Sequence, residues 1–163
     1  HWPGLTREDL LPHLDRLEGY SLRGAGGSWP GLTREDLLPH LDRLEGLDLW
    51  EAGETWPGLT REDLLPHLAR LEGLDVVEAG QRWPGLTRED LSNLARLEGI
   101  DLVRAGAEWP GLTRDDLLPH LDRLKGRNLV QAWGSWSVLT PEDIARTSTG
   151  DLSQDGSRKS LRR

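Results

Sequence analysis

The feature that most constrains this chain is a stretch of eighteen residues that occurs twice without change. "WPGLTREDLLPHLDRLEG" spans residues 2–19 and again residues 29–46, and close variants follow. A fixed period of this size is typical of a solenoid, in which each copy buries its apolar face against the next. The copies begin at tryptophans spaced by 27, 27, 27, 26 and 27 residues: Trp2, Trp29, Trp56, Trp83, Trp109 and Trp136.

We expect residues 1–146 to form one tandem array of five full copies and a partial sixth. The fourth copy is one residue shorter, because "LSNLARLEG" replaces "LLPHLDRLEG". Residues 147–163 are rich in Ser and Gly and end in basic residues, which predicts a disordered tail. The sequence begins at His1, in phase with the repeat, and contains no Met, so we interpret it as a fragment or a processed product.

The stretch "LTREDL" at residues 5–10 predicts the start of a helix in each copy. Thr6 suits the N-cap, and Asp9 three residues later completes a pair that resembles a capping box. Pro12 predicts a kink or an end of this helix, and Gly19 predicts that the element closes there. The Trp-Pro-Gly turn before the helix places its Trp against the neighbouring copy.

The apolar residues after this helix change their spacing to 3, 3 and 2. A helical stripe would continue with steps of three and four, whereas a final step of two is strand alternation. Segments such as "GLDLWEAG" and "GIDLVRAG" therefore predict a short strand. The predicted inward residues are Leu14, Leu17, Tyr20 and Leu22, then Leu41, Leu44, Leu47 and Leu49, and their equivalents in later copies.

"LDRLEGLDLWEAG" and "LARLEGIDLVRAG" resemble the leucine-rich repeat family, and the resemblance covers about residues 2–134. It implies an α/β solenoid in which short parallel strands line a concave sheet and helices pack on the convex side. Two features depart from the family pattern. Ala replaces the family's Asn at Ala25, Ala52, Ala79, Ala105 and Ala132, and the apolar residue expected two places later is absent (Gly27, Glu54, Gln81, Ala107, Gly134).

The alternative is an all-α solenoid of short helix pairs, with the second helices ending at Gly26, Gly53, Gly80 and Gly106. "WPGLTREDL" resembles the turn and helix of small bacterial antitoxin-type helix-turn-helix proteins. That resemblance implies an all-helical array that binds nucleic acid. The formal net charge of -8 opposes phosphate binding, so we do not expect a nucleic-acid partner.

Candidate chemistry in this sequence is sparse. The absence of Cys excludes disulfides and a Cys nucleophile, and no catalytic triad or phosphate-binding motif is present. Acidic pairs such as Glu8 and Asp9 suit helix capping better than acid–base catalysis. A histidine recurs without a second ligand four residues on, so we expect no metal site (His13, His40, His67 and His120). The sequence therefore predicts no enzyme, no catalytic residue and no cofactor.

The copies differ mainly at two pairs of positions after each "LEG". In a leucine-rich repeat the first pair would lie on or near the concave face, where repeat proteins vary their contacts on a constant frame. We therefore predict a non-catalytic scaffold that binds a protein or peptide partner, with Trp50 as the best single contact. The candidate partner-binding residues are Arg23, Trp50, Glu51, Val77, Glu78, Val103 and Arg104.

Other features bear on partners and compartment. No apolar run approaches the roughly 18 residues of a membrane span and no signal peptide is present, so we expect no membrane association. The lack of Cys weakly favours a cytoplasmic location. The array has no obvious cap repeats, which predicts possible self-association through its ends.

Overall fold

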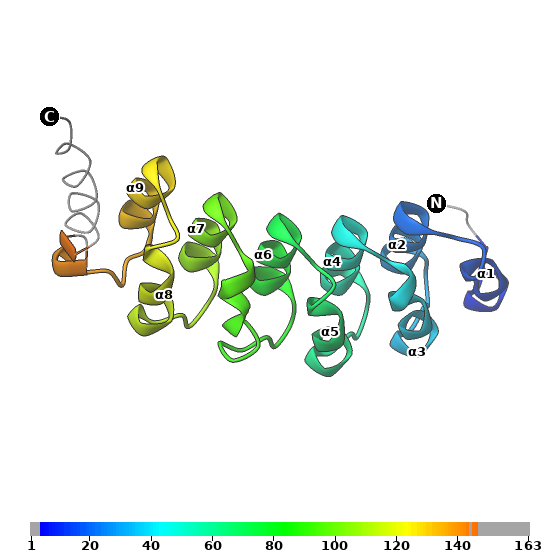
Figure 1. The fold of residues 1–163 in the computed structure, drawn as a ribbon. Helices are drawn as coiled ribbons and strands as arrows, with labels where there is room; N and C mark the ends of the chain where they lie inside the picture. The colour runs from blue at the N-terminus through cyan, green and yellow to red at the C-terminus, as the bar shows by residue number, and fades with distance from the viewer. Residues whose placement is uncertain (1–3, 144, 147–163) are drawn as a thin grey trace, which may run out of the picture. The chain divides into compact units, whose positions relative to one another are not determined.

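The computed structural model describes residues 4–143, 145 and 146, so the predicted tail of residues 147–163 lies outside the described residues. Contacts divide the chain into two compact units, residues 1–91 and residues 92–163, which we describe separately. Every regular element in the described residues is a helix, and none is a strand (Figure 1). Within the same residues no helix combines the length and the apolar character needed to span a membrane.

Most repeats form a short first helix after the Trp-Pro-Gly turn, and each full repeat forms a second helix that starts at the glycine of "LEG" or, in the fifth copy, of "LKG". In the N-terminal unit these are α1 (Arg7–Leu14), α2 (Gly19–Ser28), α3 (Arg34–Leu37) with the 3-10 helix η1 (Leu38–Arg43), α4 (Gly46–Thr55), α5 (Arg61–Leu68) and α6 (Gly73–Arg82). In the C-terminal unit they are η2 (Ser92–Arg96), α7 (Gly99–Glu108), α8 (Arg114–Leu121) and α9 (Gly126–Ser135).

The predicted leucine-rich-repeat solenoid is therefore wrong, and the alternative of short helix pairs fits the structure. Two residues separated by one position share a face on a strand but lie about 200° apart on a helix. The predicted strand residues show this difference: Leu49 is fully buried in α4, whereas Leu47 is 53% exposed. The step of two thus marks an inward and an outward residue of one helix.

The buried side of each second helix follows helical spacing instead. In α4 it consists of Leu49, Ala52 and Gly53, and the chain continues into the buried Trp56. Small residues at these positions allow neighbouring second helices to pack closely, and α4 contacts both α2 and α6 (Figure 1). This packing explains the alanine at the position where a leucine-rich repeat has Asn, because all five alanines are buried: Ala25, Ala52, Ala79, Ala105 and Ala132.

The glycines of the repeat have roles other than the predicted helix ends. Gly19 does not close an element but begins α2, with a φ of +45° that favours a residue without Cβ. Gly26 and Gly53 lie inside the second helices, two residues before those helices end. Neither glycine is a C-cap, because each makes room for a tryptophan that is described below.

The predicted starts of the first helices are confirmed in the first, second, third and fifth repeats. The backbone N–H of Thr6 donates to Asp9 Oδ2 at 2.9 Å, directly before α1. Pro12 lies inside α1, and the helix ends two residues later at Leu14. In the second repeat the equivalent Pro39 lies in η1, where α-helix has already given way to 3-10 geometry. The proline therefore shortens the first helix, as expected from its missing N–H.

The fourth repeat departs from the others. Residues 88–91 form a turn followed by η2, so no α-helix occupies the first-helix position in this repeat. This is the copy with one residue fewer. The division between the two units also falls in this repeat, after Leu91. The shortened copy is therefore the one that lacks the first α-helix and the one in which the chain divides into two units.

Candidate functional site

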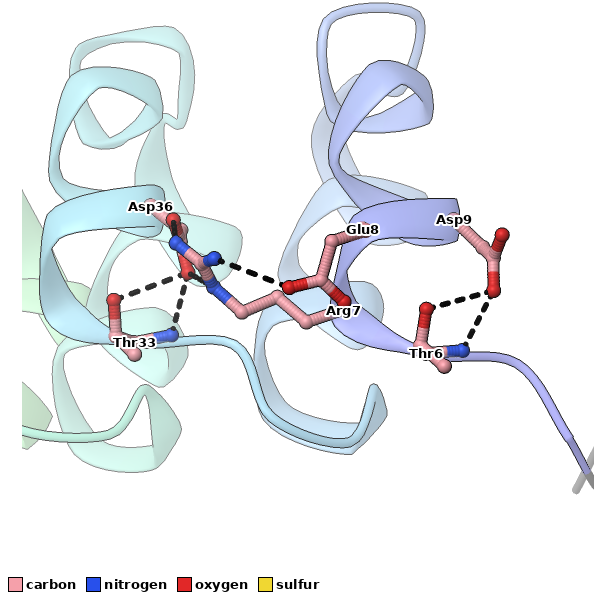
Figure 2. Close-up of polar contacts among 6 residues, drawn as sticks. All are labelled: Thr6, Arg7, Glu8, Asp9, Thr33 and Asp36. Atoms are coloured by element: carbon pink, nitrogen blue, oxygen red, sulfur yellow. Dashed lines mark hydrogen bonds and ion pairs between the residues drawn. The ribbon is translucent and has the colours of Figure 1, made fainter.

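Neighbouring first helices are joined by a partly buried ion pair. Arg7 of α1 donates two hydrogen bonds to the carboxylate of Asp36, from Nε at 2.7 Å and from Nη2 at 2.5 Å (Figure 2). Asp36 also accepts hydrogen bonds from the N–H and the hydroxyl of Thr33, at 2.9 and 3.0 Å. We call this series of pairs the Arg–Asp ladder; its other described members are Arg34–Asp63, Arg61–Asp90 and Arg114–Asp143.

The ladder fixes the charge state of its carboxylates. Hydrogen bonds from the partner arginine hold the pKa of Asp36, Asp63 and Asp90 at about 2, and that of Asp143 well below its usual range. The side chain of Asp36 is only 8% exposed. These aspartates therefore stay ionised and structural and do not act as general acids. The sequence predicts only a capping role for these aspartates. Their bond to an arginine 29 positions earlier in the chain is not apparent from the sequence.

The recurring histidine positions a second arginine. His67 Nδ1 lies 3.0 Å from Arg70 Nη1, and Arg70 Nη2 donates to the carbonyls of Asp42 and Leu44 in the preceding repeat. Burial lowers the pKa of His67, which favours the neutral ring that can accept from a guanidinium. The same arrangement recurs at His40 with Arg43 and at His120 with Arg123. Among the described residues, no group of three His, Asp or Glu is arranged to hold a metal ion.

The tryptophans that follow α4, α6 and α9 each pack on the second helix before their own. Trp56 Nε1 donates to the carbonyl of Arg23 at 3.0 Å, and Trp83 Nε1 donates to that of Trp50 at 2.9 Å. A Cβ on Gly53 would lie 2.2 Å from Trp83 Nε1, so only glycine leaves space for the indole. In the C-terminal unit Trp136 packs on Gly106 in the same way. The tryptophan thus lies against another copy, as predicted, but counted from the tryptophans that copy is two repeats earlier and not the adjacent one.

In α2 and α4 the variable positions of the sequence lie on one side of the helix, whereas in α6 and α7 the valine at the position equivalent to Trp50 is buried. In α4 they are Trp50, Glu51, Glu54 and Thr55, and together with Leu47 they follow helical spacing of three and four. The two pairs that seemed separate in the sequence thus form one surface. We call this side, at the positions equivalent to residues 47, 50, 51 and 54, the outer face; in α2 it carries Tyr20, Arg23, Gly24 and Gly27.

On the outer face, α2 and α4 are linked by charge. The Arg23 guanidinium forms an ion pair with Glu51 and lies 3.5 Å from Asp48. It also stacks 4.7 Å from the centre of the Tyr20 ring. Trp50 is half-buried, and the guanidinium of Arg82 from α6 lies 5.5 Å from its ring. Two of the predicted contact residues, Arg23 and Glu51, are therefore brought together, and Trp50 lies beside Arg82 of α6.

The remaining predicted contact residues are divided between surface and core. Glu78 is half-buried and accepts a hydrogen bond from Arg82 at 3.1 Å. Arg104 in α7 is partly exposed and bonds to Glu108. Val77 and Val103 are buried. Because the valine position faces the neighbouring helix here, these two side chains do not reach the surface.

A row of exposed apolar side chains, which the sequence did not predict, lies at the second residue of the second helices. In the N-terminal unit Tyr20, Leu47 and Leu74 are 73%, 53% and 46% exposed, and they lie on the adjacent helices α2, α4 and α6 (Figure 1). We call these three residues the apolar row. Ile100 is similarly exposed in the C-terminal unit. The sequence predicts that all four residues point inward. Only Arg127, at the same position of the fifth copy, indicates that this position accepts a charged residue.

A shallow depression of about 230 Å³ lies beside this row, between α2 and α4. It forms because Gly24 and Gly27 carry no side chains on this side of α2. The other residues around it are polar: Arg23, Ser28, Glu51 and Thr55. The depression is therefore suited to a polar group next to the apolar row.

Comparison with known proteins identifies no relative. No protein-family model, no curated protein and no solved structure matches this chain. The function is therefore inferred from the two surfaces just described. The first helices use their charged residues to hold one repeat to the next, whereas the outer face of the second helices combines exposed apolar residues with variable ones.

Proposed function

We propose that the chain is a non-catalytic repeat scaffold that binds a protein or peptide partner through the outer face of its second helices. The observation that carries this proposal is the apolar row on the same face as the variable positions. Large apolar side chains exposed at one position on successive helices form a contiguous patch, and such patches mark interaction sites. A constant frame with a variable surface is also how repeat proteins acquire recognition.

The residues beside the apolar row suit a protein partner. Tyr20 and Trp50 each lie against an arginine, Arg23 and Arg82, and aromatic and arginine side chains dominate binding energy at protein interfaces. The row requires a partner segment with apolar residues. The ion pairs around it, such as Arg23 with Glu51, require polar or charged neighbours on the same segment.

The charges of the described residues do not favour nucleic acid as the partner. The ladder arginines are paired with aspartates, and Arg43, Arg70 and Arg123 donate to backbone carbonyls. Binding to phosphates needs lysines and arginines that are available to replace counterions. The chain instead has more acidic than basic residues and a net charge of -8, which repels phosphates.

The test is selection of binding peptides from a displayed library against the full chain, followed by measurement of their affinity. Changing Leu47→Ser together with Leu74→Ser should weaken binding at least about tenfold, which corresponds to about 1.4 kcal/mol. Because both side chains are exposed, the free energy of unfolding should change by less than about 0.5 kcal/mol. Trp50→Ala should also weaken binding, through loss of an aromatic anchor.

The matched control is Leu5→Ser, which makes the same chemical change at an exposed leucine outside the second helices. Affinity for the selected peptides should be unchanged in this variant. Equal affinity for the Leu47/Leu74 variant and the original chain would rule out the outer face as the binding surface.

A further inference from the structure

The apolar row is bordered by a row of acidic side chains. Each of its residues follows a glutamate by two positions: Glu18 before Tyr20, Glu45 before Leu47 and Glu72 before Leu74. Because consecutive Cα atoms are about 3.8 Å apart, each glutamate Cα lies within about 7.6 Å of the Cα of its apolar neighbour. All three glutamates are exposed, and we call them the glutamate row.

The carboxylates of the glutamate row have no partner within the described part of the chain. Each glutamate is the N-cap of its second helix, but its side chain makes no capping hydrogen bond. Among the described residues, none of the three forms an ion pair. Their negative charge is therefore available to a binding partner.

The other charges of the outer face do not neutralise this row. The three second helices of the N-terminal unit contain no lysine, and Arg23 and Arg82 are their arginines. Arg23 pairs with Glu51, and Arg82 pairs with Glu54 and Glu78. An exposed apolar row beside unpaired carboxylates therefore requires a partner that is both apolar and cationic.

The glutamate and the apolar residue also occur together along the chain. In the fourth copy Glu98 precedes the exposed Ile100 by two positions. In the fifth copy both change, since Lys125 stands at the glutamate position and Arg127 at the apolar position. The two features are thus present together in four copies and absent together from the fifth, which indicates that they form one surface.

The spacing of the apolar row indicates the shape of the partner. Packed helices lie about 8–10 Å apart, and α2, α4 and α6 are neighbours in that order. Along a helix, residues seven positions apart lie on the same side and about 10 Å from each other. An extended strand covers this distance in about three residues, which places successive contacts on opposite faces. A helix can therefore present one apolar residue to each member of the row.

We propose that the outer face of the N-terminal unit binds a basic amphipathic helix. The helix lies across α2, α4 and α6, with apolar residues at every seventh position on the apolar row. Lysines or arginines on the adjacent side of the helix form ion pairs with the glutamate row. This inference rests on the proposed function, because it specifies the class of partner for the same face.

The probe is a fluorescent peptide of about 20 residues, mostly Ala, with Leu at every seventh position and Lys three and four positions after each Leu. Fluorescence anisotropy with the full chain measures its affinity, and circular dichroism measures its helix content. The peptide should bind and gain helix on binding. Two control peptides, one with scrambled order and one with Glu in place of Lys, should bind at least about tenfold more weakly.

The charged part is tested by changing the glutamate row to Gln (Glu18→Gln, Glu45→Gln and Glu72→Gln). Affinity for the probe should fall at least about tenfold at low salt and less at high salt, because the lost ion pairs are exposed. Since these side chains make no capping hydrogen bond, the variant should fold like the original chain, which circular dichroism checks.

A matched control makes the same change of charge on the first helices. Its substitutions are Glu8→Gln, Glu35→Gln and Glu62→Gln, at side chains that are 75%, 75% and 76% exposed. Affinity for the probe should change by less than about twofold in this variant, because charges beyond about 8 Å are screened at physiological salt.

The inference is wrong if the probe does not bind, binds without gaining helix, or binds no better than the scrambled peptide. It is also wrong if the two glutamate variants lose the same affinity. In each of these cases the proposed function is unaffected, provided that peptides selected from the library still depend on Leu47 and Leu74. Loss of that dependence would contradict the proposed function itself, and this inference with it.

Discussion

The first and second helices of each repeat differ in how strictly their sequence is kept. In the first helices Thr, Arg, Asp and His recur, and each of these side chains bonds to its own helix start or to a neighbouring repeat. In the second helices only the buried side, such as Leu49, Ala52 and Gly53, is constant in character. Many of the side chains that are the same in every copy therefore contact another repeat, although the exposed glutamate of "TRED" is kept as well.

The largest effect is expected from Gly53→Ala, which tests the constant side of a second helix. The new Cβ would meet the Trp83 indole at 2.2 Å, so the ring must move and its hydrogen bond to the Trp50 carbonyl is lost. Overpacking and a lost hydrogen bond together should lower the free energy of unfolding by about 3 kcal/mol. Urea unfolding followed by tryptophan fluorescence measures this loss.

The control for that variant is Gly24→Ala, on the outer face of α2. No atom lies within 4 Å of a Cβ at this position, and Ala favours a helix over Gly by about 1 kcal/mol. This variant should be as stable as the original chain or more stable. If both glycine variants lose the same stability, the contrast between the two sides of the second helices is incorrect.

A smaller loss is expected from Asp63→Ala, which breaks the ladder in the first helices. It removes the acceptor for Arg34 and for the Thr60 N–H, and should cost about 2 kcal/mol of unfolding free energy. Asp9→Ala removes only the bonds from Thr6, so its cost should be clearly smaller. Equal losses in the two variants, measured by urea unfolding, would show that the interhelical bonds contribute nothing.

The smallest effect is a pH dependence carried by the His–Arg contacts. Burial lowers the pKa of His40, His67 and His120 in the folded chain, so the unfolded chain binds protons first as pH falls. Their stabilisation is fully present above the unfolded value of about 6.5 and is lost progressively below it. Urea unfolding at several pH values between 7 and 5 should show a gradual decrease in stability.

Changing these three histidines to Gln keeps an uncharged acceptor for the arginines and should remove the decrease between pH 7 and 5. A second decrease, from about pH 4 toward 2, should remain in both proteins, because Asp36, Asp63 and Asp90 have pKa values of about 2. A triple variant that still loses stability between pH 7 and 5 would assign that dependence to other groups.

Local signals in the sequence were sufficient for several features of this protein. The period and the capping pair of Thr6 and Asp9 follow from residue spacing and short-range hydrogen bonds. The variable positions were also identified from the sequence, but their surface was not. Leu47 and Trp50 lie three residues apart, and a helix brings positions with that spacing to one side, whereas a strand places them on opposite faces.

Tertiary structure decided between strand and helix. Leu47 and Leu49 are both leucines, so the sequence does not show that one is exposed and the other is buried. Stacking also decided the second role of "TRED", because Arg34 and Asp63 lie 29 residues apart and meet only when two repeats pack together. The sequence by itself determined the repeat and its helix starts, since these depend on contacts within a few residues. Packing between repeats decided which face of each second helix is buried, and it also brought together the residues of the Arg–Asp ladder.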